Sequence, residues 1–185
     1  MDHAGYGVEP LNGVSKGGEH PFGQGRGQYP GREVALFIVA SFIVMPLFSC
    51  AGTRPVNLGI KDSRLAPCPS TPNCVSSDAT DFAHAIAAFQ LVVPPAQAWR
   101  ALRSVLESLP RVQIVTATDD YVHAECGSAF FGFVDDLELH LRAPQNIIAV
   151  RSASRLGHSD FGVNRKRVES LRARLLERGL VRIEF

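Results

Sequence analysis

The polar side chains best suited to chemistry in this sequence are concentrated in the segment 135–165. Guanidinium groups and the free amides at a helix start both attract negative charge, so this segment could bind an anion or another small polar ligand. The candidate ligand-binding residues are Asp135, Arg151, Ser152, Ser154, Arg155, His158, Ser159, Asn164 and Arg165. The alternative is structural: Asp135 would accept hydrogen bonds from Ser152 and Ser154, and the arginines would form ordinary surface ion pairs.

A hydrolytic site built on Asp135, Arg155 and His158 is a second interpretation of the same residues. A catalytic triad needs a nucleophile, a base and an orienting acid that are brought together in space. The contiguous run His158-Ser159-Asp160 supplies these residue types but implies no such arrangement. The sequence therefore assigns no catalytic residue and no cofactor, and it favours a binding domain over an enzyme.

A metal site is a third interpretation, and it depends on how one predicted hairpin pairs. If the hairpin turns at residues 131–132, its outer face pairs His123 with His140 and Glu125 with Glu138. Imidazole and carboxylate groups in this arrangement could hold zinc or copper. Arginines on the neighbouring strand positions can neutralise the glutamates instead, so we predict exposed sheet residues and no metal.

Hydrophobic periodicity predicts a strand, a helix, four strands and a final helix. The strands cover residues 85–93, 112–118, 121–128, 134–142 and 147–154. The first helix begins at Pro94-Pro95 and ends at Pro110, and its apolar stripe is Trp99, Leu102, Leu106 and Leu109. The second helix is capped by Ser159 or Asp160 and ends at Gly179, and its buried stripe is Phe161, Asn164, Val168, Leu171 and Leu175.

These half-apolar strands and one-sided helices predict an α+β fold. We expect a two-layer sandwich in which two helices cover one face of a mostly antiparallel sheet of about five strands, with the outer face solvated. If residues 143–146 form the loop between the last two strands, Glu138 faces Arg151 and Asp135 faces Ser154. Cys126 should be a buried small apolar residue.

An uninterrupted apolar run at residues 34–49 precedes Cys50. The run is short for a bilayer span, which needs roughly 20 residues, and suits the apolar core of an export signal. Leu47-Phe-Ser-Cys50 resembles the lipobox of bacterial lipoproteins, in which the signal is removed and the cysteine is acylated. We therefore expect lipidation at Cys50 and a membrane-anchored, periplasm-facing location in a bacterial envelope. An uncleaved anchor and a buried apolar segment are the alternatives.

Four regions follow from this pattern. Residues 1–33 are glycine-rich and are either disordered or lie before the true start; 34–50 form the signal and lipobox; 51–83 form a tether; and 84–185 form the globular domain. Cys68 and Cys74 bracket a loop rich in turn-forming residues, and cysteines this close should pair in an oxidising compartment. Their spacing is not the two-residue one of redox-active pairs.

Charge and aromatic residues limit the partners. The net charge is +1, and aromatic residues are not interleaved with basic ones, so we predict no nucleic-acid binding. The predicted partners are the membrane through the lipid anchor and either an envelope protein or a small anionic ligand. A structural lipoprotein of the envelope is the remaining alternative. Phe130, Phe131 and Phe133 surround Gly132, and they either cover the end of the core or form an exposed patch that contacts a partner or lipid.

Four blocks carry a family resemblance. They are LAPCPSTPNCVSS at 65–77, FGFVDD at 131–136, VRSASRLG at 150–157 and SDFGVNRKRV at 159–168. Together they resemble the family called domain of unknown function 1499, over roughly residues 65–176. The resemblance implies an exported or membrane-associated bacterial protein, with relatives in plastids. It implies no activity and no catalytic residue.

Overall fold

The structure is a computed structural model that describes residues 52–129 and 132–183. The predicted N-terminal extension, the apolar run, Cys50, Phe130 and Phe131 lie outside the described residues. No helix in the described part is both long and apolar enough to cross a membrane.

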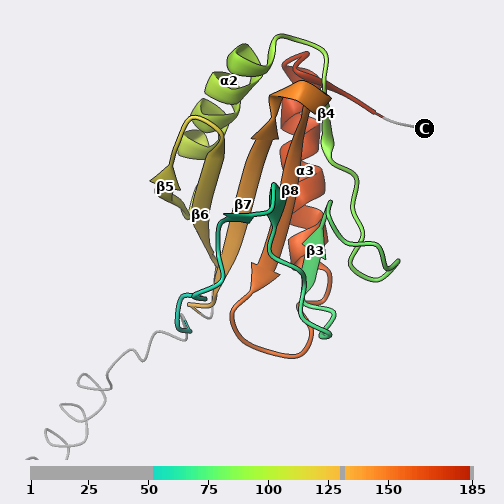
Figure 1. Ribbon diagram of the computed structural model, residues 1–185. Coiled ribbons are helices and arrows are strands. Elements are labelled where there is room, and N and C mark those ends of the chain that lie inside the picture. The colour runs from blue at the N-terminus through green and yellow to red at the C-terminus, as the bar shows by residue number, and fades with distance from the viewer. Residues whose placement is uncertain (1–51, 130–131, 184–185) are drawn as a thin grey trace, which may run out of the picture. The chain divides into compact units, whose positions relative to one another are not determined.

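The described chain forms an α+β fold with a seven-stranded antiparallel sheet, which confirms the predicted class (Figure 1). In sheet order the strands are β5 (Val112–Ala117), β6 (Tyr121–Gly127), β7 (Val134–Arg142), β8 (Ile147–Ser154), β4 (Phe89–Leu91) and β9 (Val181–Arg182). The short β3 (Cys74–Ser76) pairs with β8 beyond β4, and β1 (Ile60–Lys61) pairs with β2 (Arg64–Leu65) in a separate hairpin. A 3-10 turn at Ala143–Gln145 joins β7 to β8.

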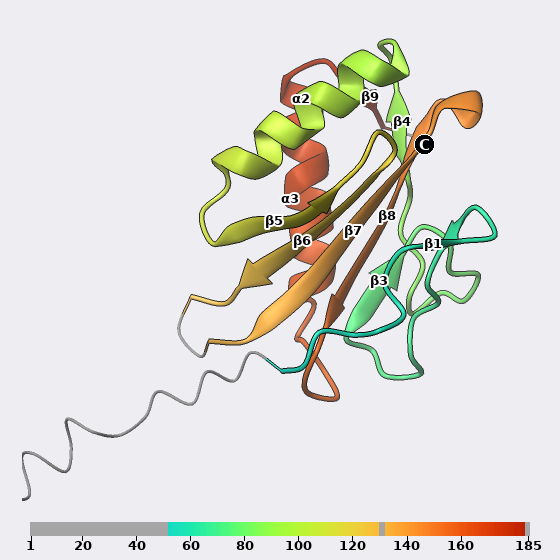
Figure 2. The same ribbon diagram turned by 60° about the vertical axis from the view of Figure 1, so that its left-hand side comes forward.

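Two helices cover the same face of the sheet, as predicted (Figures 1 and 2). Helix α2 (Pro95–Ser108) has proline in its first turn, where an absent amide leaves no intrahelical bond unmade. Its buried side chains include Trp99, Leu102 and Leu106 of the predicted stripe. Helix α3 (Val163–Glu177) buries Asn164, Val168, Leu171, Arg172 and Leu175. The apolar side chains of the two helices pack on the inward residues of the sheet and form one continuous core.

Phe161 was wrongly assigned to the buried stripe of the last helix. The helix begins only at Val163, and Phe161 lies in the preceding turn with a φ of 53°. Its side chain is 89% exposed. The helical spacing that predicted its burial therefore does not extend to this residue.

The β7–β8 register is confirmed, because Glu138 faces Arg151 and Asp135 faces Ser154. The predicted β6–β7 register is wrong: His123 faces Glu138, and His140 faces Tyr121. The cause is the position of the hairpin, in which the Ser128 amide donates to the Phe133 carbonyl at 2.8 Å. This pairing centres the hairpin earlier in the chain than residues 131–132.

The outer sheet face is not solvated, contrary to our expectation. The segment 52–67 lies across it, on the side opposite the two helices (Figure 2). The Gly59 amide donates to Glu138 at 2.7 Å, and Leu65 is only 4% exposed beside Tyr121 and Ala149. Part of the predicted tether therefore packs on the sheet as a cover, and β3 from the same region joins the sheet itself.

The predicted disulfide between Cys68 and Cys74 is present, with the two Cα atoms 5.7 Å apart. Cys74 is buried in β3, so the bond fastens the covering segment to the sheet edge. Cys126 is a free cysteine, 3% exposed within the core, as expected. Burial raises the pKa of its thiol to about 11, which keeps it protonated at neutral pH.

Candidate functional site

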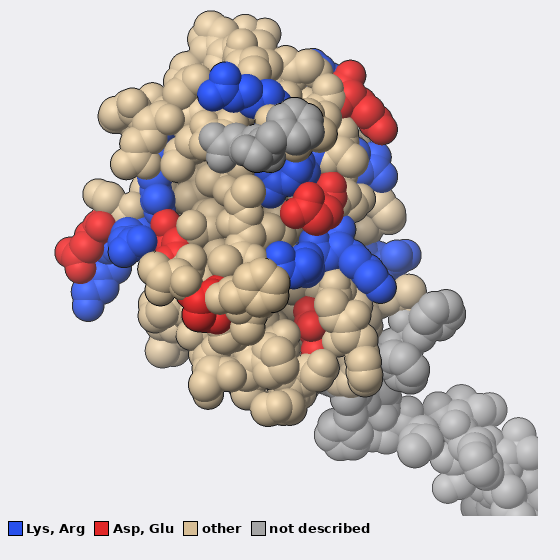
Figure 3. Space-filling model, turned by 90° about the vertical axis from the view of Figure 1, so that its right-hand side faces the viewer, with Lys and Arg blue, Asp and Glu red and all other residues tan. Residues whose placement is uncertain are grey.

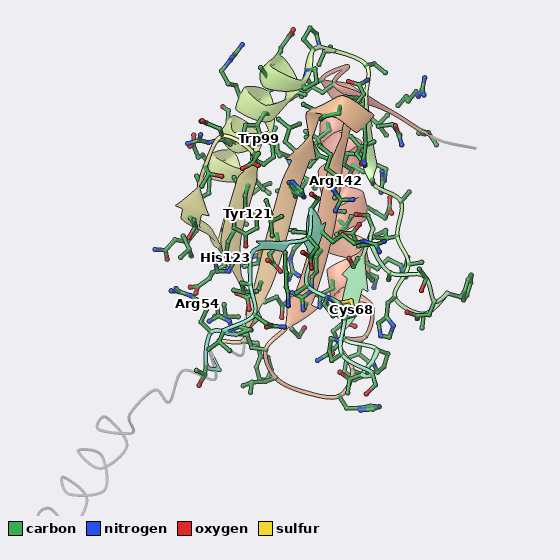
Figure 4. The ribbon with its side chains drawn as sticks, in the orientation of Figure 1. Arg54, Cys68, Trp99, Tyr121, His123 and Arg142 are labelled. Carbon is green, nitrogen blue, oxygen red and sulfur yellow. A yellow bond between two sulfur atoms is a disulfide. The ribbon has the colours of Figure 1, made fainter. Side chains whose placement is uncertain are left out.

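The covered face carries a group of six polar side chains that we call the outer polar network. Its members are Tyr121, His123, Asp136, Glu138, Arg151 and Arg155. They come from β6, β7, β8 and the residue directly after β8, and the period-two alternation of strands places them on one face. Figure 4 labels Tyr121 and His123 on this face, with Arg54 below them and Arg142 above.

Glu138 is the centre of the network and is fully buried. One carboxylate oxygen accepts hydrogen bonds from the Tyr121 hydroxyl at 2.8 Å and from the Gly59 amide at 2.7 Å. The other accepts from Arg151 Nη1 at 2.9 Å. Burial, followed by the neighbouring Glu138 charge, raises the pKa of Tyr121 well above its usual range, so its hydroxyl stays a donor.

Asp136 is the second acceptor and is 1% exposed. Arg155 donates from Nε to Oδ2 at 2.8 Å and from Nη2 to Oδ1 at 2.7 Å, and His123 Nε2 lies 2.7 Å from the same Oδ1. Burial alone would raise the pKa of Asp136, but the bonds from Arg155 and His123 outweigh burial and lower it. An ionised carboxylate only accepts, so Nε2 of His123 is the donor in this bond.

Further ion pairs flank the network at both ends. At the lower end Arg155 and Arg54 both donate to Glu125, at 2.6 Å in each case, and these bonds lower its pKa. At the upper end Arg142 forms a two-point pair with Asp78, at 2.9 and 2.6 Å. The covering segment thus supplies Arg54, and the turn after β3 supplies Asp78, as charged partners for residues at the two ends of this face.

A cavity of about 380 Å³ lies between the covering segment and the network. We call it the outer-face cavity, and its lining is Pro55, Asn57, Pro67, Cys68, Pro69, Asp136, Arg151, Ala153, Ser154 and Arg155. Arg151 is 4% exposed, and its Nε is buried without a hydrogen-bond partner among the described residues. A buried N–H in that state is costly, by about 1–3 kcal/mol, until an acceptor reaches it.

The inner face holds a separate polar cluster around Asn164 of α3. Its Oδ1 accepts from Ser152 at 2.6 Å and from Arg167 at 2.6 Å, while its Nδ2 donates to Ser154 at 2.9 Å. Arg167 also binds Asp135 at 2.5 Å, so a side chain of α3 holds this carboxylate and not the hydroxyls of β8. Asp135, Ser152, Ser154 and Asn164 therefore connect the sheet to α3.

The predicted site residues thus divide between the two faces of the sheet. Arg151 and Arg155 belong to the outer polar network, whereas His158 and Ser159 lie exposed in the loop after β8. Arg165 donates to the Ala83 carbonyl at 3.2 Å, away from both groups. The set proposed for hydrolysis is not assembled, because Arg155 binds Asp136 and Glu125 on one face while Asp135 binds Arg167 on the other.

The suggested metal ligands have protein partners instead. His123 is bound to Asp136, and Glu138 is bound by Arg151. His140 lies 3.3 Å from Arg142 Nε, and burial and the Arg142 charge lower its pKa. Within the described ranges, no group of three or more His, Cys, Asp or Glu side chains is arranged to hold a metal ion.

Two functional partners were missed by the sequence analysis. Tyr121 shares its strand face with His123, and the alternation of β6 could have identified it as a partner of Glu138. Arg167 lies one helical turn after Asn164 on the same side of α3, which is the spacing of side chains that meet. Asn57 and Pro55 carry no periodic signal that would place them over the sheet.

A profile of the family described as "Protein of unknown function (DUF1499)" matches residues 64–175. This range runs from β2 through almost all of α3, so it contains the outer polar network, the inner cluster and the disulfide. Comparisons with curated proteins and with solved structures found no match. Since the matched range covers more than half of the chain, the protein belongs to the DUF1499 family.

Proposed function

We propose that this protein is a lipid-anchored protein of the bacterial cell envelope whose folded domain binds a small carboxylate in the outer-face cavity. The observation that carries the proposal is the guanidinium of Arg151. It is buried, Glu138 occupies only Nη1, and Nε has no protein acceptor among the described residues while the side chain lines a cavity. A planar carboxylate is the acceptor that best matches the edge of an arginine.

The charges around the cavity limit the ligand to a weakly charged molecule. Arg151 and Arg155 are balanced by Glu138 and Asp136, so the network has no large positive excess to offset a multiply charged anion. The opposite wall is apolar, with Pro55, Pro67 and Pro69. A volume of about 380 Å³ lies in the range of small-molecule sites. A monocarboxylate with a small apolar body fits these conditions.

The envelope location is supported by Cys50 after its apolar run and by the Cys68–Cys74 disulfide, which is stable in an oxidising compartment. Intact-mass measurement of the native protein tests it. A chain that begins at Cys50 and carries the mass of acyl groups is expected. A native chain that retains residues 1–49 would contradict the lipidated anchor.

Thermal unfolding in the presence of acetate, propanoate and butanoate tests the ligand. At 100-fold excess over Kd, binding should raise Tm by about 5–10 °C. Acetamide, which has the same shape without the charge, should give a much smaller shift. A Tm that responds equally to carboxylates, to acetamide and to matched chloride would refute carboxylate binding.

Three variants separate binding from general effects on the fold. Arg151→Lys removes the two-point edge but keeps the charge, so the Tm shift should be lost. Ala153→Leu fills the cavity without touching a hydrogen bond of the network, and it should abolish the shift as well. Arg100→Lys, at an exposed position of α2, is the matched control and should retain the full shift.

A further inference from the structure

Four large apolar side chains are exposed together at one end of the domain. Phe161 is 89% exposed, Leu156 47%, Val163 46% and Phe133 42%. All four line one hollow of about 450 Å³, which distinguishes them from apolar residues that are exposed singly elsewhere. We call this group the anchor-proximal patch.

Local hydrogen bonds hold Phe161 in this exposed position. The Ser159 hydroxyl accepts from the Phe161 amide at 3.3 Å, and the Asp160 carboxylate accepts from the amides of Gly162 at 3.0 Å and Asn164 at 2.7 Å. Phe161 itself has a φ of 53°, which is uncommon for an aromatic residue. The loop is thus built to keep a large apolar side chain in solvent, and such backbone strain collects at functional sites.

The chain enters the fold directly beside this patch. A Cβ added to Gly52 would lie 3.0 Å from Leu156 Cγ, so residue 52 packs on Leu156. In Figures 1 and 2 the loop from β8 to α3 lies at the same end as this entry point. Cys50 is two residues earlier in the sequence, and two residues of extended chain span at most about 7 Å. Lipid attached to Cys50 would therefore leave the chain close to the patch.

The charges near the patch favour apolar insertion over electrostatic attraction. The residues that line the hollow include no Lys or Arg, and its two carboxylates are satisfied internally. Asp135 is bound by Arg167, and Asp160 is bound by the amides at the start of α3. Acidic and basic side chains are also interspersed on the side of the molecule seen in Figure 3, so that side offers no single-sign surface to an anionic membrane.

We propose that the anchor-proximal patch docks on the lipid bilayer that holds the Cys50 anchor, with Phe161 inserted at the boundary of head groups and acyl chains. This inference rests on the proposed lipid anchor and adds an orientation to it. An exposed aromatic and aliphatic cluster next to the acylated cysteine adds a second apolar contact with the bilayer, and two contacts fix how the domain is oriented.

Fluorescence quenching by brominated phosphatidylcholine tests the docking. The natively acylated protein is reconstituted in neutral vesicles as the Phe161→Trp variant. The matched control is Val92→Trp, at a half-exposed position at the start of the turn before α2. Trp99 is buried in both variants and in the parent protein, whose signal is subtracted. If residue 161 lies about 5–10 Å deep in the interface, its quenching should exceed that at residue 92 at least about threefold and should not depend on salt.

The outcomes distinguish failure of the docking from failure of the anchor. Protein that floats with the vesicles but shows equal quenching at the two positions keeps its anchor and overturns the docking. Protein that does not float overturns both. A patch that instead joins two copies of the chain would show concentration-dependent dimers that Phe161→Asp dissociates, and this result would also overturn the docking.

Discussion

Replacing Glu138 with glutamine should measure how completely the covering segment seals the outer polar network. Glu138 is fully buried, and Arg151, its ion-pair partner 2.9 Å away, is 4% exposed. The amide of glutamine can still accept from the Tyr121 hydroxyl and the Gly59 amide, so these bonds survive. The substitution therefore removes mainly the charge and leaves Arg151 unpaired in a buried site.

The expected loss follows from this geometry. Leaving one member of a buried ion pair without its partner costs about 3–5 kcal/mol, and the surviving hydrogen bonds place Glu138→Gln near the lower value. Because domains are typically stable by about 5–15 kcal/mol, the variant should still fold. Exposed pairs behave differently: Glu169→Gln breaks a pair with Arg172 in which the glutamate is 51% exposed, and it should cost less than about 1 kcal/mol.

Equilibrium urea unfolding in a mild detergent gives the measurement. Trp99 is the only tryptophan in the chain and is 4% exposed, so its emission reports unfolding of the domain. Arg151→Met combined with Glu138→Gln removes both charges and should recover about 2 kcal/mol relative to Glu138→Gln alone. If Glu138→Gln costs no more than Glu169→Gln, the face is solvated and the reasoning from burial is refuted.

Three further predictions concern acid, the disulfide and the free thiol. Although burial alone would raise them, arginine hydrogen bonds hold the pKa values of Asp78 and Asp136 below the usual 3.8, so their contribution to stability is present above that pH and lost as pH falls through the folded values. The urea concentration at the unfolding midpoint should therefore decrease as the pH is lowered below about 4. A midpoint that stays constant down to pH 2 would contradict this. Cys68→Ala opens the loop closed by the disulfide and should lower the free energy of unfolding by about 2–3 kcal/mol in the same assay, whereas an unchanged value would mean that the bond does not constrain the unfolded chain. Cys126, buried with its pKa raised to about 11, should resist iodoacetamide at pH 8 until the protein unfolds, and rapid alkylation of the native protein, detected by mass spectrometry, would show that this part of the core opens.

The alternation of apolar and polar residues was sufficient to predict strand pairing where the sequence of the connecting loop clearly indicated a turn. The four residues 143–146 form a tight connection, so Glu138 and Arg151 were placed opposite each other correctly. The β6–β7 hairpin gave no comparable turn signal, and its register was misplaced by an even number of residues. The alternation therefore still placed His123 on the correct face, but the prediction paired it with His140, whereas the structure pairs it with Glu138.

Burial of the outer face was not predictable in the same way. The segment that covers it contributes only the two-residue strands β1 and β2, whose turn places Asp62 and Ser63 at positive φ. Such a segment has no periodicity, and composition alone made it look like a tether. Charged residues alternating along β7 then appeared solvated, although the same pattern also fits a buried face on which every charge is paired.

The covering segment connects the proposed anchor to the proposed ligand cavity. It supplies Pro55 and Asn57 to the cavity wall. At its start Gly52 packs against Arg155, because a Cβ added to Gly52 would lie only 2.9 Å from the Cβ of Arg155. Arg155 in turn holds Asp136 at the cavity floor with two hydrogen bonds. Any displacement of the chain at Gly52 therefore acts on Arg155 and on the cavity together. If the domain rests on the bilayer through the anchor-proximal patch, membrane contact and ligand binding share one segment. Each should then stabilise the position of that segment over the sheet, and so favour the other.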